Sequence, residues 1–200
     1  MNKIMYFIAM IILTASCSNE SERYILNCSS NKKNADSAYI YIYEKEYGAL
    51  RLYDKEALKN GRVSFTGQVA EPKIAFLKLS NDTVPYYFIL DNNSIRISLK
   101  DDRFILRGGN ENNNYYRYLL LRQNIVNAKK SLWQKYEKYA GDSVLTDSIE
   151  NALKLFNDKL TDSLENVTTD YIKTHDLGSE IIWRRFGNSL PDNKIQLLKR

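Results

Sequence analysis

Residues 103–120 read RFILRGGNENNNYYRYLL, and this stretch decides the fold. Its first five residues end a series of short β-type segments, whereas from Tyr118 onward apolar residues recur every three or four positions, as in helices. Gly108 and Gly109 separate the two patterns, and they lack the Lys-Ser/Thr of a phosphate-binding loop. We therefore expect an α+β chain, with a β-rich module over 24–107, a glycine hinge, and a helical region over 108–200.

The β-rich part shows strand periodicity and turn chemistry. Tyr39, Tyr41 and Tyr43 alternate with two isoleucines, which predicts three rings on one face of a strand. Asn60-Gly61 suits a turn that needs positive φ. Strands are expected at residues 24–28, 38–43, 50–54, 61–66, 74–79, 86–90, 94–99 and 103–107. This spacing predicts an antiparallel β-sandwich or a small barrel.

The helical part carries two apolar stripes on either side of Gly141-Asp142. They comprise Tyr118, Leu121, Ile125, Ala128, Leu132, Tyr136 and Tyr139, then Leu145, Ile149, Ala152, Phe156, Leu160, Leu164, Val167 and Tyr171. Two such stripes joined by a short turn predict an antiparallel hairpin. A short helix is expected over 180–186 and another over 192–200 after Pro191. Trp133 and Trp183 have helical positions that favour core packing over stacking on sugars.

The first residues indicate export and lipid attachment. Residues 1–16 have a lysine followed by an apolar run over 4–13, the pattern of a signal peptide that is too short to span a membrane. Small residues before Cys17 resemble a lipobox, so we expect acyl chains on this cysteine. The alternative is an ordinary secretory signal with a coincidental cysteine. Residues 17–23 are polar and predict a tether to the outer membrane of a cell envelope, with the periplasmic or surface face left open.

Charge and cysteine usage narrow the function classes. The formal charge is +5, with 44% hydrophobic and 26% charged residues, so the chain is globular and only mildly basic. Export and interleaved acids argue against a nucleic-acid partner. A surface of mixed, solvated charges is expected, with attraction to anionic glycans or lipid headgroups as the alternative. Cys28 is left without a disulfide partner and is expected to be buried in a strand, so dithiol exchange by the chain alone is excluded.

A family resemblance rests on residues 59–69, KNGRVSFTGQV, and 71–77, EPKIAFL. These segments resemble a domain-of-unknown-function family at the N-terminus of Bacteroidota envelope lipoproteins. In that family the domain often precedes a thioredoxin-like domain of the AhpC/TSA type. The resemblance implies a β module plus a helical linker. The thioredoxin-like domain itself is missing here, which implies either a stand-alone version or a chain cut short near Arg200.

Catalytic patterns are weak, so neither a cofactor nor a bound metal is expected. His175, the single histidine, is interpreted as a polar residue at a helix end before Gly178, because no nucleophile motif accompanies it. Asp91 and Asp101-Asp102 lack the alternation of a calcium loop. A hydrolase using Asp91 and Glu111 is a distant hypothesis that fails if the two carboxylates lie far apart and exposed. Arg184-Arg185 is expected to be a solvated helix face.

A repeated Asp-Ser/Thr-apolar pattern resembles the O-glycosylation acceptor of exported Bacteroidota proteins. The candidate hydroxyls are those of Ser37, Thr83, Ser143, Ser148 and Ser163. The same dipeptide also caps helices and starts turns, and both explanations stay open.

Together these patterns predict a non-enzymatic, membrane-anchored envelope lipoprotein. Its β module and hairpin would act as a binding or assembly module for an unidentified ligand, with envelope proteins or glycans as partners. The alternative function is a truncated or regulatory form of a thioredoxin-like thiol-disulfide oxidoreductase lipoprotein.

Overall fold

The structure is a computed structural model that describes residues 23–44, 49–101, 103–137 and 146–186. Each of the eight predicted strands is present, and each observed end lies within three residues of its predicted position. The strands are β1 (Tyr24–Ser30), β2 (Ser37–Glu44), β3 (Ala49–Ala57), β4 (Arg62–Gly67), β5 (Lys73–Leu79), β6 (Tyr86–Leu90), β7 (Ser94–Lys100) and β8 (Arg103–Arg107). The helices are α2 (Asn110–Glu137), α3 (Thr146–Thr174) and α4 (Asp176–Phe186).

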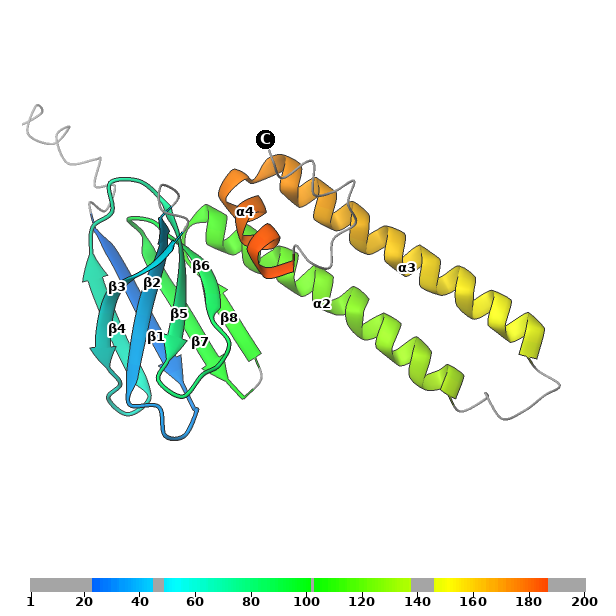
Figure 1. Ribbon diagram of the computed structural model, residues 1–200, viewed down its shortest axis with the longest axis horizontal. Helices are drawn as coiled ribbons and strands as arrows, with labels where there is room; N and C mark the ends of the chain where they lie inside the picture. The colour runs from blue at the N-terminus through cyan, green and yellow to red at the C-terminus, as the bar shows by residue number, and fades with distance from the viewer. Residues whose placement is uncertain (1–22, 45–48, 102, 138–145, 187–200) are drawn as a thin grey trace, which may run out of the picture.

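The strands form two separate four-stranded sheets, in the orders β4-β1-β7-β8 and β3-β2-β5-β6. Figure 1 shows them as the two layers of a sandwich, so the alternative of a small barrel is wrong. Most neighbouring strands are antiparallel, as predicted, but β1 and β7 are parallel, with Asn27 beside Arg96. The chain crosses to the other sheet between these two strands, so no hairpin forces them to run in opposite directions.

The core lies between the sheets and follows from strand alternation. Ile40 and Ile42 are buried and pair with Leu77 and Ala75 of β5, while the tyrosines that alternate with the isoleucines point outward. From the other sheet, Leu26 and Ile97 are at most 2% exposed. The predicted separation of isoleucines and tyrosines on β2 is therefore confirmed.

Helices α2 and α3 form the predicted antiparallel hairpin, which projects from the sandwich in Figure 1. α4 begins at Asp176, four residues earlier than predicted, and contains Gly178. Gly178, which the sequence placed before this helix, therefore lies within it. A Cβ at this position would lie 2.2 Å from the Tyr171 hydroxyl, so glycine permits close packing of α4 on α3. The helix predicted over 192–200 lies outside the described residues.

A buried asparagine joins the two halves of the molecule. Gly108 and Gly109 connect β8 to α2 with φ of 113° and 65°, as expected of a hinge. In the first turn of α2, the Asn112 Nδ2 donates to Ile89 O at 2.7 Å, and its Oδ1 accepts from Ile89 N at 2.8 Å. The side chain thus acts like one residue of an added strand at the free edge of β6. Ile181 and Ile182 of α4 are also fully buried.

The outer part of the hairpin is less buried than its apolar stripes predict. Trp133 is 54% exposed and Phe156 is 49% exposed, so the expectation of core packing is wrong for Trp133. Two helices alone cannot enclose the circumference of either one, which leaves apolar residues uncovered. The side chain of Trp183 lies outside the described part of the structure.

Among the described residues, no helix combines the length and the apolar character needed to cross a membrane.

Candidate binding surface on the sandwich

The outer face of the β4-β1-β7-β8 sheet presents two rows of mainly polar side chains across its strands. The register aligns Ser64, Asn27, Arg96 and Arg107 in the first row. It aligns Arg62, Ser29, Ser98 and Ile105 in the second. Neighbouring side chains within a row lie about 4.8 Å apart, the spacing of strands in a sheet. Ser29 and Ser98 are joined by a hydrogen bond of 3.3 Å between their hydroxyls.

This outer face, which we call the basic face, has one sign of charge. Its members are the outward-pointing residues of the four strands: Ile25, Asn27, Ser29, Arg62, Ser64, Thr66, Ser94, Arg96, Ser98, Lys100, Arg103, Ile105 and Arg107. Five of them are cations and none is an acid. Within the described part of the chain, Arg62, Arg96 and Arg107 make no ion pair. The expectation of mixed charges is therefore wrong for this surface.

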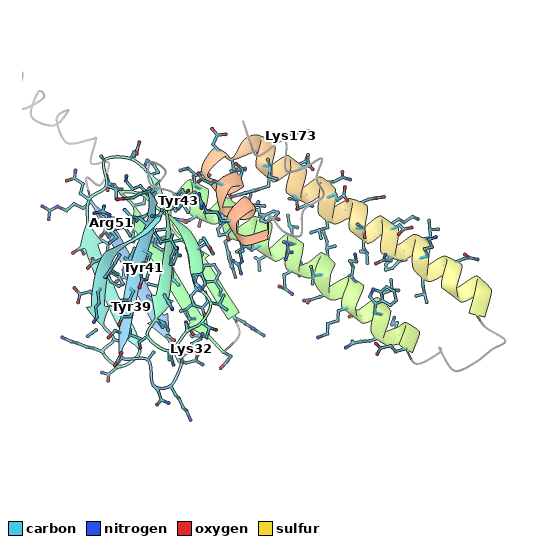
Figure 2. All side chains as sticks on the ribbon, viewed as in Figure 1. Lys32, Tyr39, Tyr41, Tyr43, Arg51 and Lys173 are labelled. Carbon is cyan, nitrogen blue, oxygen red and sulfur yellow. The ribbon has the colours of Figure 1, made fainter. Side chains whose placement is uncertain are left out.

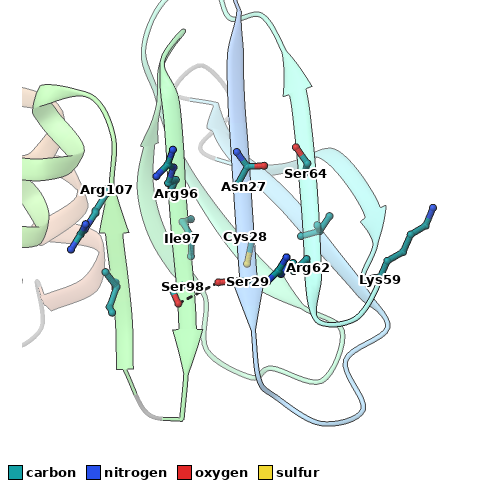
Figure 3. A pocket seen from close by; sticks show the side chains of 12 residues that line it. Asn27, Cys28, Ser29, Lys59, Arg62, Ser64, Arg96, Ile97, Ser98 and Arg107 are labelled. Atoms are coloured by element: carbon teal, nitrogen blue, oxygen red, sulfur yellow. Dashed lines mark hydrogen bonds between the residues drawn. The ribbon is translucent and has the colours of Figure 1, made fainter.

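A hollow of about 900 Å³ lies over the centre of the basic face. Figure 3 shows Arg96 and Arg107 at one side of it, Arg62 and Lys59 at the other, and Asn27 and Ser29 of β1 between them. Guanidinium groups bind carboxylates, sulfates and phosphates in a bidentate manner, whereas hydroxyl and amide groups exchange hydrogen bonds with alcohols. The hollow is therefore suited to a ligand that carries both anionic groups and hydroxyls.

Cys28 lies at the floor of this hollow but is only 3% exposed. Burial, which is the larger effect, and the nearby Asp82 carboxylate together raise the pKa of its thiol to about 12. Both effects disfavour the thiolate. The predicted burial of Cys28 is confirmed.

The outer face of the other sheet, which we call the tyrosine face, is aromatic and partly covered by the helices. Figure 2 shows Tyr39, Tyr41 and Tyr43 following one another along β2. The Tyr41 and Phe76 rings stack at 5.1 Å between centroids, so they present mainly edges to solvent. Arg184 of α4 lies 3.2 Å above the centre of the Tyr43 ring and donates to Glu180 at 2.7 Å. The prediction that Arg184 belongs to a solvated face is wrong, because a planar guanidinium stacks well on an aromatic ring.

His175 directly follows α3, so its predicted place at a helix end is confirmed. Its ring stacks on Tyr171 at 4.4 Å between centroids, and Nδ1 lies 2.7 Å from the Thr174 hydroxyl. These contacts account for a structural role at the base of the hairpin. Among the described residues, no three His, Cys, Asp or Glu side chains form a group that could hold a metal ion.

The two carboxylates of the hydrolase hypothesis are not exposed, contrary to the condition that would exclude it. Burial raises the pKa of Asp91, whose Oδ2 accepts a hydrogen bond from Asn93 at 2.9 Å. Asp91 Oδ1 and Glu111 Oε2 are both buried without a hydrogen-bond partner in the described part of the chain. Asp91 Oδ2 lies next to Gly109, where a Cβ would come within 2.7 Å, so the carboxylate sits against the N-terminus of α2. This placement gives Asp91 a structural role, because a helix N-terminus attracts negative charge.

The remaining predicted sites are scattered over the chain. Thr83 is exposed in the turn before β6, and Ser37 begins β2 with partial exposure. Ser163 is exposed on α3, where its hydroxyl donates to the Lys159 carbonyl. The side chain of Ser148 and all of Ser143 lie outside the described part, as does Cys17. The structure does not gather Ser37, Thr83 and Ser163 into one site.

The arginines of the basic face were missed by sequence reasoning, although a signal was present. In Arg62-x-Ser64, Arg96-x-Ser98 and Arg103-x-Ile105-x-Arg107, every outward position lacks an acid. The alternation of side chains along a strand places each set on one face of its strand, but it does not show which strands are neighbours in the sheet.

Residues 24–115 match a protein family described as a domain of unknown function (DUF4369). The matched segment contains the whole sandwich and the first turns of α2, including Asn112, while most of the hairpin lies beyond it. The expected resemblance to a domain-of-unknown-function family is thus confirmed for the β module. No curated protein matches this chain.

Proposed function

We propose that the protein is a lipid-anchored lipoprotein of the Bacteroidota cell envelope, and that its sandwich is a non-catalytic module that binds an anionic glycan on the basic face. The observation that carries the ligand class is the uncovered set of Arg62, Arg96 and Arg107 around a hollow lined with serines and Asn27. The anchor rests on the sequence around Cys17.

An anionic glycan suits this surface better than a lipid bilayer. A glycan chain fits into a hollow and presents hydroxyls to Asn27, Ser64 and Ser98 and carboxylate or sulfate groups to the arginines. A bilayer would instead favour a protruding surface with apolar or aromatic side chains that enter the headgroup region. Of the outward residues on this sheet, Ile25 is the only exposed large apolar side chain, at 45%.

The binding test compares polymers that share one backbone. The full chain is titrated with dextran, carboxymethyl dextran and dextran sulfate at a series of salt concentrations. We expect the charged polymers to bind and dextran to bind at least tenfold more weakly. The double variant Arg96→Glu/Arg107→Glu should lose about a hundredfold or more in affinity, because each of the two charge-assisted contacts contributes about 1.5–3 kcal/mol.

A matched control separates this surface from general electrostatics. Lys55→Glu/Lys78→Glu makes the same change in net charge around the tyrosine face. Equal losses for both double variants would overturn the proposed site. Binding to vesicles of anionic phospholipid through the same arginines, without binding to either charged dextran, would overturn the glycan assignment.

The anchor is tested separately. Wild-type protein should partition into the detergent phase and carry lipid mass, and Cys17→Ala should lose both. Several acyl chains hold a protein stably on a membrane, whereas one alone does so only marginally. Wild-type protein that is soluble and lipid-free would contradict the lipoprotein assignment.

The alternative, a regulatory or truncated form of a thioredoxin-like lipoprotein, requires redox chemistry from outside the described residues. The buried Cys28, with its raised pKa, is unsuited to attack a disulfide. A thioredoxin-like domain with a C-x-x-C motif encoded directly downstream of Arg200 would favour this alternative.

A further inference from the structure

A groove runs between α2 and α3 on one side of the hairpin. At the base of the hairpin it has a volume of about 310 Å³, and its walls include Arg117 and Leu121 of α2 and Val167 and Asp170 of α3. These walls show which helix positions share this side of the hairpin.

The groove continues toward the hairpin tip as an apolar face. Leu121 lies about 70° round α2 from the line of contact with α3 that Tyr118 and Lys129 mark. Phe156 is displaced in the same rotational sense, by about 130°, from the line that Thr161 and Thr168 mark on α3. When each helix is viewed from its own N-terminus, equal senses of rotation away from the contact line place residues of two antiparallel helices on the same side of the hairpin. The stripe residues that follow on this side are Ile125, Ala128 and Leu132 on α2, and Leu160 on α3.

The opposite side of the hairpin base is already covered. Tyr115 lies on the other side of the α2–α3 contact line from Leu121, and it is buried where Arg185 of α4 donates to its hydroxyl at 3.2 Å. Among the described elements, α4 therefore completes the packing on one side only. On the groove side, Leu121 and Phe156 remain 47% and 49% exposed.

Two opposite charges flank the groove at the same level. Tyr118 contacts Thr168 and Tyr171, and Asp170 lies between these two residues on α3. Arg117, which is next to Tyr118 on α2, therefore lies at a height that matches Asp170. Both side chains are exposed and line the groove, and within the described part of the chain neither makes an ion pair. A binding partner for this side should therefore carry an acid opposite Arg117 and a base opposite Asp170.

We propose that the partner is a second copy of this chain, packed groove to groove as a four-helix bundle around a two-fold axis parallel to the hairpin. This axis places α2 of one copy against α3 of the other. Rotation about this axis does not change the position of a residue along the hairpin. Arg117 therefore contacts the partner's Asp170, and Asp170 contacts the partner's Arg117. Such reciprocal contacts are the mark of a two-fold interface.

The same axis leaves both β modules at one end of the bundle. Two chains anchored by lipid in one membrane could therefore associate without either one turning over. This compatibility rests on the proposed anchor, whereas the interface itself does not.

Charge reversal provides the decisive test. Sedimentation equilibrium of the full chain in density-matched detergent should show a monomer–dimer equilibrium. Arg117→Asp and Asp170→Arg should each raise the dimer dissociation constant about tenfold or more, because both reciprocal pairs become repulsive. A mixture of the two variants should form heterodimers as tight as wild type, since every pair across that interface is again attractive. Failure of the mixture to associate would overturn the proposed pairing.

Neighbouring leucines provide matched controls for the apolar contact. Leu120 and Leu121 are both 47% exposed, but only Leu121 lies on the groove side. Leu121→Ser should weaken the dimer about tenfold, and Leu120→Ser should leave it unchanged. Phe156→Ser and Leu155→Ser should differ in the same way. Wild-type protein that stays monomeric throughout, or equal effects within both pairs, would overturn the proposal.

Discussion

The two outer faces of the sandwich differ in composition and in what covers them. The tyrosine face has helices packed beside it, with Arg184 stacked on Tyr43 and Phe76 only 7% exposed. The basic face carries five cations and no acid, and its arginines remain exposed. Burying aromatic surface lowers the free energy of folding, whereas burying unpaired guanidinium groups would raise it. The difference suggests that one face serves stability and the other serves binding.

The largest predicted effect tests whether a reagent can pass from the hollow on the basic face to the Cys28 thiol. Native Cys28 should react with iodoacetamide about a thousandfold more slowly at pH 8 than the same residue in unfolded protein. Only the thiolate reacts, and a rise in pKa from 9.0 to about 12 lowers its population by about three factors of ten. The rate, measured by mass spectrometry, should increase with pH until about 12.

The control for this measurement is the same reaction in denaturant, where the pKa returns to its ordinary value. Rapid labelling of native protein at pH 8 would show that the hollow reaches into the core. It would also make Cys28 a candidate for thiol chemistry.

The next effect concerns the attachment of the helices beside the tyrosine face. Asn112→Leu should lower the free energy of unfolding by about 2–4 kcal/mol, because the buried N–H and C=O of Ile89 both lose their partner. Urea denaturation followed by circular dichroism measures this change. Asn124→Leu, at an exposed position of the same helix, should change stability by less than about 0.5 kcal/mol. Equal effects for the two variants would refute the proposed role of Asn112.

A smaller difference is expected between the losses of stability when one arginine from each face is replaced. Arg184→Ala should cost about 1–2 kcal/mol, because it removes both the cation–π contact with Tyr43 and the hydrogen bond to Glu180. Arg96→Ala should cost less than about 0.5 kcal/mol, or stabilise slightly by relieving repulsion from Arg107. Thermal unfolding of both variants gives the comparison. A larger loss for Arg96→Ala would reverse the assignment of the two faces.

The strands could be predicted closely because their signals are local. Alternation over residues 38–43 and Asn60-Gly61 at a turn need no knowledge of the rest of the chain. The prediction of an antiparallel sandwich holds for most strand pairs, and the exception is the parallel pair β1 and β7, whose strands are far apart in sequence. Trp133 illustrates the same limit in the helices, since its helical position does not reveal how many neighbours surround it.

By itself, the sequence determined the order and type of the elements, the hinge at Gly108 and Gly109, and the burial of Cys28. Each follows from periodicity or from the backbone preferences of a few adjacent residues. Only the tertiary structure decided that Arg96 stands between Asn27 and Arg107, and that Arg184 reaches Tyr43. Those neighbours come from distant segments, and their meeting depends on strand order and helix packing, which no local pattern encodes.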